Sequence, residues 1–307
     1  MASPTRTSFS RVARGAVALA AVASLTGCGL VGASESQLDT VVVGSANFTE
    51  SALLGEIYAQ ALESHDIPVE RQFNIGNREA YMKSIEGDNP SINILPEYLG
   101  YLLEYYQKDI PDMSVDAVKA QLQRELPEQL EILDISQATD EDAIVVTQQT
   151  AAKYDLQTIG DLAPVADQFV AGGSPEFRTR RAGVAGMRDV YGVEFQGYKT
   201  LDTAGPLSLE ALLNNQIQVS DFFTTQSVIQ ENDLVILKDP KGILPPGNIV
   251  PVIRDDVPER DQVEESLNAI SAALTTQKLT EMVRRVDVEK EPLETVAEDF
   301  LTQEGPV

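Results

Sequence analysis

The chain has 307 residues, with 48 acidic against 23 basic side chains, and its formal net charge is −25. Such a surplus of acid argues against a nucleic-acid partner, because the phosphate backbone favours clustered Lys and Arg. The charge serves either solubility outside the cytoplasm or a preference for cationic ligands. The only cysteine is Cys28 and the only histidine is His65. We therefore expect no disulfide, no zinc centre and no histidine-based triad.

The first 27 residues have the pattern of a secretory signal. Three arginines precede an apolar stretch at 15–25, whose 11 residues are too few to span a bilayer, which needs about 20. The run Leu-Thr-Gly-Cys that ends at Cys28 resembles the lipobox of bacterial lipoproteins, in which the thiol is acylated and the preceding segment is removed. We expect a signal peptide at 1–27, a lipid on Cys28 and a flexible, Gly- and Ser-rich tether at 28–38. The alternative is a free or buried thiol behind an ordinary signal peptide.

From residue 40 onward, short β-branched runs alternate with longer segments at helical spacing, which is typical of an α/β domain. A strand is predicted at 40–43 and a helix at 50–64, with Thr49 placed to cap that helix. The apolar face of this helix comprises Leu53, Leu54, Ile57, Tyr58, Ala61 and Leu62. Further elements are predicted as a helix at 79–86, strands at 69–75, 92–95, 143–147, 169–171, 194–198, 219–223 and 234–237, and a mostly helical tail from residue 259.

No catalytic constellation emerges from the sequence. The glycines at 183 and 186 lack both the lysine and the spacing of a phosphate-binding loop. Carboxylates are so numerous that chance pairs are unavoidable. We expect a protein that is not an enzyme and that uses neither a cofactor nor a metal.

Six segments occur in the same order as in a known family. They are 44–50 (GSANFTE), 95–100 (LPEYLG), 172–177 (GGSPEF), 244–246 (LPP), 250–254 (VPVIR) and 286–300. Together they resemble the substrate-binding proteins of osmoprotectant ABC importers, which take up glycine betaine, choline, carnitine and similar compounds. The resemblance extends over residues 40–303.

The resemblance implies a type II periplasmic-binding-protein fold, in which two α/β lobes are joined by two crossing segments and close on a ligand in the cleft. We expect lobe 1 to comprise 39–140 and 228–307 and lobe 2 to comprise 141–227. The crossings are expected near 134–144 and 223–234.

The same resemblance implies a function in transport. The chain would be a monomer, held by its lipid on the outer face of the cytoplasmic membrane, that delivers a small solute to a permease with ATPase subunits. A lipoprotein of the same fold that acts as a sensor or interaction module is the rival interpretation.

In this family a cage of tyrosines attracts the quaternary ammonium head, and a basic residue holds the ligand's carboxylate. By position, Tyr98 and Phe223 correspond to cage aromatics, Arg180 to the basic residue and Asp140 to a polar position near the cage. The planar guanidinium suits a bidentate grip on a carboxylate.

Three departures from the family pattern affect the predicted site. Asp142 and Leu209 stand where tyrosines are expected, and Ala46 stands where a lysine is common. Losing two cation–π contacts of roughly 2 kcal/mol each would cost about 4 kcal/mol, close to a thousandfold in affinity. Either Asp142 pairs directly with a ligand ammonium, or the ligand is a polar or aromatic molecule larger than betaine.

Other side chains are candidates to rebuild the site. Tyr101 lies one helical turn from Tyr98, and Arg78 follows a predicted helix start as an anion or hydroxyl anchor. Phe48, Phe222 and Phe223 are candidates for the opposite side of the cleft. The alternative interpretation is core packing for Phe222 and Tyr101, and a surface role for Arg78. The candidate ligand-binding residues are Asn47, Phe48, Arg78, Tyr98, Tyr101, Asp140, Asp142, Arg180, Phe223, Thr224 and Thr225.

Overall fold

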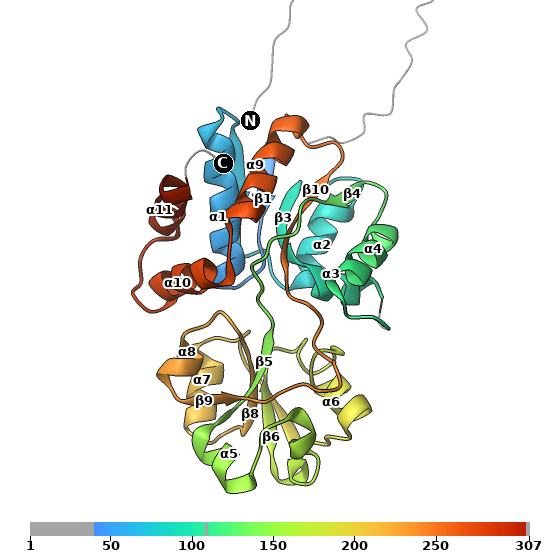
Figure 1. Cartoon of the computed structure of the whole chain (residues 1–307), viewed down its shortest axis with the longest axis vertical. Coiled ribbons are helices and arrows are strands. Elements are labelled where there is room, and N and C mark those ends of the chain that lie inside the picture. The colour runs from blue at the N-terminus through green and yellow to red at the C-terminus, as the bar shows by residue number, and fades with distance from the viewer. Residues whose placement is uncertain (1–39, 108–109, 305–307) are drawn as a thin grey trace, which may run out of the picture. The chain divides into compact units, whose positions relative to one another are not determined.

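The structure is a computed structural model that describes residues 40–107 and 110–304 (Figure 1). The predicted signal peptide, the tether and Cys28 lie outside the described residues. Within the described ranges, no helix combines the length and the apolar character that crossing a membrane requires.

The first sheet has five strands in the order β2-β1-β3-β10-β4. β1 is parallel to both β2 and β3, whereas β10 is antiparallel to β3 and β4. Every residue of β1 is buried, as expected for a parallel strand covered on both faces. The strands are β1 (Val41–Gly44), β2 (Val69–Gln72), β3 (Ile94–Tyr98), β4 (Leu130–Ile132) and β10 (Ile249–Arg254).

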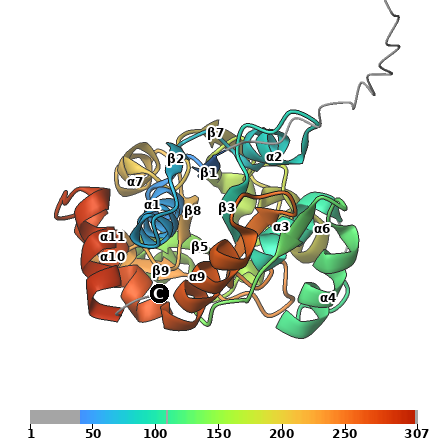
Figure 2. The same ribbon diagram turned by 90° about the horizontal axis from the view of Figure 1, so that it is seen from above.

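Helices cover both faces of this sheet, and Figure 2 shows α1 beside α9 to α11, with α3 and α4 on the other side. One layer is α1 (Thr49–Ser64), α9 (Arg260–Ala273), α10 (Thr276–Asp287) and α11 (Leu293–Glu304). The other is α2 (Arg78–Glu86), α3 (Leu99–Tyr106) and α4 (Val115–Glu125). The apolar face predicted for α1 is buried along its whole length, which confirms that prediction.

The start of α1 differs from the prediction. Phe48 occupies the N-cap position without a side-chain capping bond. Thr49 is already helical, and its hydroxyl donates a 2.7 Å hydrogen bond to Oδ1 of Asp287 in α10. The prediction that Thr49 caps the helix was wrong, because the helix begins one residue earlier than predicted and places Phe48, which has no capping oxygen, at the N-cap.

The second sheet has the order β7-β6-β8-β5-β9. β6 is parallel to β7 and β8, and β5 is antiparallel to β8 and β9. Its strands are β5 (Asp142–Thr147), β6 (Val170–Gly173), β7 (Gly197–Thr200), β8 (Val219–Phe223) and β9 (Leu234–Ile236). One face packs against α5 (Gln148–Tyr154), η1 (Ile159–Leu162), η2 (Ala166–Gln168) and α6 (Val184–Tyr191), and the other against α7 (Pro206–Leu213) and α8 (Val228–Glu231).

Two segments connect the sheets, one between β4 and β5 and one between β9 and β10 (Figure 1). They run side by side: the Asp140 N–H donates to the Gly247 carbonyl at 2.9 Å, and the Ile249 N–H donates to that of Ala138 at 3.0 Å. A Cβ on Gly247 would lie 1.8 Å from the Asp140 carbonyl oxygen, so only glycine permits this approach.

The second connection lies later in the chain than predicted. Residues from 228 onward were expected in lobe 1, with the return near 223–234. Instead β9 pairs with β5 and forms the edge of the second sheet, through Val145 opposite Ile236 and Thr147 opposite Leu234. Residues 228–236 therefore belong with the second sheet, because the short apolar run 234–236 completes its edge.

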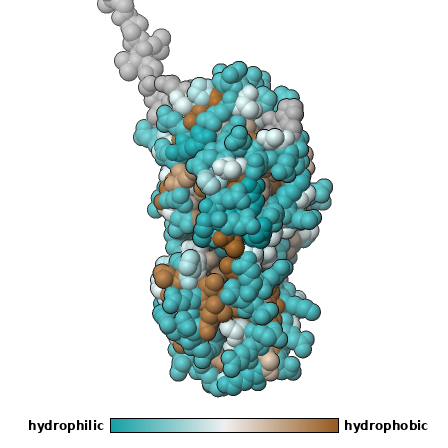
Figure 3. All heavy atoms as spheres, turned by 90° about the vertical axis from the view of Figure 1, so that its left-hand side faces the viewer, coloured by the Kyte–Doolittle hydropathy of each residue, from teal (hydrophilic) through white to brown (hydrophobic). Residues whose placement is uncertain are grey.

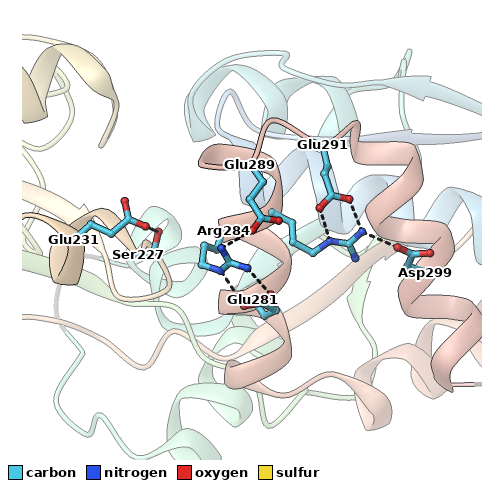
Figure 4. A network of polar contacts seen from close by, with 8 residues as sticks. Ser227, Glu231, Glu281, Arg284, Glu289, Glu291 and Asp299 are labelled. Carbon is cyan, nitrogen blue, oxygen red and sulfur yellow. Dashed lines mark hydrogen bonds and ion pairs between the residues drawn. The ribbon is translucent and has the colours of Figure 1, made fainter.

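Ion pairs join the last helices (Figure 4). Arg284 contacts Glu281 at 2.7 Å and Glu289 at 2.8 Å, while Arg285 contacts Asp299 of α11 at 2.6 Å. Exposed ion pairs contribute little individually, so the apolar face of α11 carries most of its attachment.

Figure 3 shows the face of the molecule on the α10 and α11 side, where hydrophobic residues gather mainly over the lower part, around the second sheet.

Candidate functional site

A pocket lies where the connections after several strands of both sheets converge. Its cavity volume is about 60 Å³, so in this arrangement the surrounding side chains nearly fill it. Its lining comes from the segments after β1, β3, β6 and β8, from the start of α2 and from the segment entering β5. The lining residues are Ala46, Asn47, Phe48, Asn77, Arg78, Tyr81, Tyr98, Tyr101, Asp140, Glu141, Asp142, Ser174, Glu176, Arg180, Thr203 and Phe223.

Three aromatic rings form one wall of the pocket. The Phe48 ring centroid lies 5.0 Å from that of Phe223 and 6.0 Å from that of Tyr98, with tilted planes in both pairs. The Tyr98 hydroxyl donates to Oε1 of Glu50 at 2.8 Å, which fixes the ring at the junction of β3 and α3. The wall offers ring faces to an apolar or cationic group.

Two arginines reach the pocket, and they differ in their partners. Arg78 is neutralised by buried Glu97, with Nε to Oε1 at 3.0 Å and Nη2 to Oε2 at 3.1 Å. Arg180 is placed by a turn in which its N–H donates to the Glu176 carbonyl at 2.9 Å. Among the described residues, the Arg180 guanidinium has neither a hydrogen bond nor an ion pair, so it is the cation available to a ligand anion.

Buried carboxyl groups surround the same pocket. Burial raises the pKa of Asp142 to about 7, with Arg180 opposing the shift. Burial, with Glu50 beside it, also raises the pKa of Asp140, although that carboxylate accepts hydrogen bonds from the Thr224 hydroxyl at 3.0 Å and the Thr225 N–H at 3.1 Å. The pocket therefore combines the Arg180 guanidinium, which has no hydrogen-bonded partner among the described residues, with buried carboxyl groups whose pKa values are raised.

Direct hydrogen bonds cross from the first lobe to the second around the pocket. The Asn77 side-chain amide donates to Oε1 of Glu176 at 2.6 Å, and the Asp142 N–H donates to the Tyr101 hydroxyl at 2.7 Å. On another side, Oε1 of Glu104 accepts from the Arg181 N–H at 2.6 Å. These contacts link the two sheets independently of the two connecting segments.

Nine of the predicted ligand-binding residues line the pocket, namely Asn47, Phe48, Arg78, Tyr98, Tyr101, Asp140, Asp142, Arg180 and Phe223. Thr224 and Thr225 lie behind it and hold Asp140. Phe222, 1% exposed, packs in the core of the second lobe, as its alternative interpretation stated. Leu209 lines a neighbouring groove.

The sequence reasoning did not select Asn77, Tyr81, Ser174, Glu176 and Thr203. Two signals were available: Ser174 and Glu176 stand inside the GGSPEF segment, and Asn77 directly precedes Arg78. Asn77 also caps α2, since its side chain accepts from the Ala80 N–H. Across the described residues, no group of three or more His, Cys, Asp and Glu side chains is arranged to hold a metal ion.

Two helix-covered mixed sheets, joined by two paired connections beside a pocket, define a type II periplasmic-binding protein. Residues 39–303 match the family model described as the substrate binding domain of ABC-type glycine betaine transport system. The chain belongs to this family.

Known proteins of this class are similar over most of the chain. The carnitine transport binding protein OpuCC of Listeria monocytogenes is 25% identical, covering 90% of this chain and 91% of that protein. The glycine betaine-binding protein YehZ of Escherichia coli is 28% identical, covering 86% and 90%. The ergothioneine transport permease/ergothioneine binding protein EgtU of Helicobacter pylori is 27% identical over 86% of this chain, which spans only 48% of that protein.

A solved structure of YehZ without ligand superimposes with a TM-score of 0.60 at 26% identity, covering 88% of this chain and all of that one. A glycine betaine/carnitine/choline ABC transporter structure gives a TM-score of 0.66 at 22% identity, covering 86% and 98%. The second similarity concerns the fold alone.

Proposed function

We propose that this chain is the extracytoplasmic solute-binding lipoprotein of an ABC importer, which holds a small compatible solute in the described pocket and delivers it to a membrane permease. It binds reversibly and without turnover, and the ATPase subunits of its partner supply the energy. Support comes from the family match and from relatives whose names record carnitine, glycine betaine and ergothioneine binding.

The observation that carries the proposal is the composition of the pocket. An aromatic wall of Phe48, Tyr98 and Phe223 stands in one cavity with the available guanidinium of Arg180 and the carboxylate of Asp142. Rings and an acid attract a cationic group, and the guanidinium attracts an anionic one. The solute class that uses all of these features is a small zwitterion.

The binding step is tested by a thermal-shift screen of the full chain, purified in detergent, against glycine betaine, carnitine, choline, ergothioneine, dimethylglycine and sarcosine. A ligand at about 100 times its dissociation constant adds roughly 2.7 kcal/mol to the free energy of unfolding. The proposal expects such a shift for at least one compound. If none of them raises the melting temperature, the importer proposal fails.

An uptake assay distinguishes an importer's binding protein from a sensor of the same fold. In cells deleted for the chain, uptake of the radiolabelled solute that gives the largest thermal shift should fall to background and recover on complementation. Unchanged uptake, with binding intact, would instead favour a sensor.

We propose further that Cys28 carries the lipid that keeps the protein near its permease. In cells fed labelled palmitate, the wild-type chain should incorporate label, and Cys28→Ser should abolish incorporation and release the protein from the membrane fraction. Labelling that persists in Cys28→Ser contradicts this assignment.

A further inference from the structure

Asp142 is a buried acid without a partner for its side chain. It begins β5, is 8% exposed and lines the pocket. Its N–H donates to the Tyr101 hydroxyl at 2.7 Å, but its carboxylate has no hydrogen bond or ion pair among the described residues. An ionised carboxylate held out of water without donors is unfavourable, so this position calls for a donor from outside the protein.

A second unpartnered acid stands on the same face of the sheet. In the antiparallel pair of β5 and β8, Asp142 lies opposite Phe223 and Ile144 lies opposite Asp221. Because side chains alternate along a strand, Asp142 and Asp221 project from the same face as diagonal neighbours. Oδ1 of Asp221 is buried and has no hydrogen-bond partner. The two acids lie beside each other next to the pocket, and burial raises the pKa of both.

The basic groups nearby do not satisfy these acids. Arg78 is already paired with Glu97, and Arg180 acts on Asp142 and Asp221 only as a nearby charge. The other groups that face Asp142, Glu104 and Asp140, are acidic. The local balance therefore favours a positively charged ligand group.

We propose that Asp142, supported by Asp221, selects a solute whose cationic or ring nitrogen carries at least one N–H group, in preference to a fully alkylated ammonium. This inference rests on the proposed function, because it concerns the solute of the same pocket. The solute class is a zwitterion with its carboxylate on Arg180, its N–H on Asp142 and its apolar part against Phe48 and Phe223.

The selection follows from hydrogen-bond chemistry. An ionised carboxylate only accepts hydrogen bonds, and charge-assisted bonds from an N–H cation are about twice as strong as neutral ones. A trimethylammonium group offers no N–H, so it leaves the carboxylate desolvated and unpaired. A site built to bond an N–H group rejects analogues that lack it.

Protonation provides an independent readout. Burial raises the pKa of Asp142 to about 7, so the free protein carries this group partly protonated near neutrality. A bound N–H cation favours the ionised form, so binding at pH 6.5 releases a proton and tightens as the pH rises. Proton release is measured by calorimetric titration in buffers of different ionisation enthalpy.

The test uses ligands that differ only in N-methylation: sarcosine, dimethylglycine and glycine betaine, and in parallel dimethylethanolamine and choline. Dissociation constants are measured by calorimetry on the full chain in detergent. The inference expects an N–H member to bind roughly tenfold or more tightly than its quaternary counterpart. Asp142→Asn should remove that preference and the proton release, while Asp116→Asn, an exposed acid on α4 that lines no part of this pocket, should leave both unchanged.

The outcomes separate this inference from the proposed function. Tighter binding of the quaternary members, or an unchanged ranking in Asp142→Asn, overturns the role of Asp142 and leaves the binding protein intact. If no member of either series binds while ergothioneine, which has a ring N–H, does, the inference stands only if Asp142→Asn weakens binding of ergothioneine by roughly tenfold and abolishes its proton release. Binding of carnitine alone, whose ammonium has no N–H, overturns the role of Asp142. Absence of binding by every compound overturns the proposed function itself.

Discussion

The hydroxyl of Thr225 donates a 2.6 Å hydrogen bond to Oε2 of Glu50. Thr225 follows β8 in the second lobe, and Glu50 lies in the first turn of α1 in the first lobe, so a single buried acid joins the two. The other oxygen of Glu50 accepts from the Tyr98 hydroxyl, which also lines the pocket. Glu50 therefore connects a ring of the pocket wall to the second lobe, although it does not line the pocket itself.

Glu50 should make stability depend on pH. Burial raises its pKa to about 7 from an ordinary value of 4.5, with the bonds from Thr225 and Tyr98 opposing the shift. The folded state therefore binds this proton more tightly than the unfolded state, and the associated stability is complete below pH 4.5 and is lost as the pH rises through 7. Melting temperatures of the wild type should fall across this interval.

Glu50→Gln keeps the size of the side chain and removes its titration. The variant should show a flatter profile and melt at least about 2 °C above the wild type at pH 8. The control Glu70→Gln changes an exposed acid on β2 and should follow the wild type. Parallel profiles of Glu50→Gln and wild type would show that Glu50 is not the titrating group.

Tyr98 should contribute to binding through its ring. Tyr98→Ala removes one ring of the aromatic wall and is expected to weaken binding of the solute found in the screen by roughly tenfold or more, since a desolvated cation–π contact contributes about 2 kcal/mol. Tyr98→Phe keeps the ring and loses only the bond to Glu50, so its affinity should stay within about threefold of the wild type. Calorimetric titration measures both, and equal affinities of Tyr98→Ala and the wild type would remove Tyr98 from the site.

Gly247 should be essential to the connection between the lobes. Gly247→Ala places a Cβ 1.8 Å from the Asp140 carbonyl oxygen, and the forced backbone shift should lower the free energy of unfolding by about 2 kcal/mol or more. Gly197→Ala is the matched control, because its Cβ would meet only Val170 at 4.0 Å. Urea unfolding should therefore separate the two variants, and a Gly247→Ala chain as stable as Gly197→Ala would disprove the close approach.

Glu176 should stabilise the liganded arrangement. Its carboxylate accepts from Asn77 across the pocket at 2.6 Å, and Glu176→Ala should speed solute dissociation about fivefold, since a typical hydrogen bond contributes about 1 kcal/mol. Stopped-flow dissociation, with Glu210→Ala on α7 as control, measures this effect. Equal dissociation rates in wild type and Glu176→Ala would show that the contact does not hold the lobes on the ligand.

Local sequence patterns predicted most elements, because the spacing of apolar residues over a few positions distinguishes helices from buried strands. β8 has the bounds predicted for it, and the apolar face of α1 is buried as predicted. One error is a helix boundary, because α1 begins at Thr49 and not after it. The other is a pairing between distant segments, because β9 joins β5 across about 90 residues. The local pattern of residues 234–236 does not specify which strand they pair with.

The same limit applies to the site. The family resemblance predicted that Tyr98, Phe223 and Arg180 lie in one pocket, because each stands at a position that corresponds to a ligand-binding residue of the family, and all three line the pocket. The proximity of Asp142 to Asp221 follows from the antiparallel register of β5 and β8, which the sequence does not specify. The pairing of Arg78 with Glu97 likewise joins α2 to β3, so composition alone could not show that this cation is already neutralised.

Arg180 provides the most direct test of the central claim that this pocket binds a small zwitterionic solute. Calorimetric titration of the full chain should give one site per chain for the solute that shows the largest thermal shift. Arg180→Ala should weaken it by roughly tenfold or more, because the ligand carboxylate loses a charge-assisted bond. Arg178→Ala, two residues away and exposed beside Tyr198, should bind like the wild type. Equal affinities of Arg180→Ala and the wild type would contradict the claim.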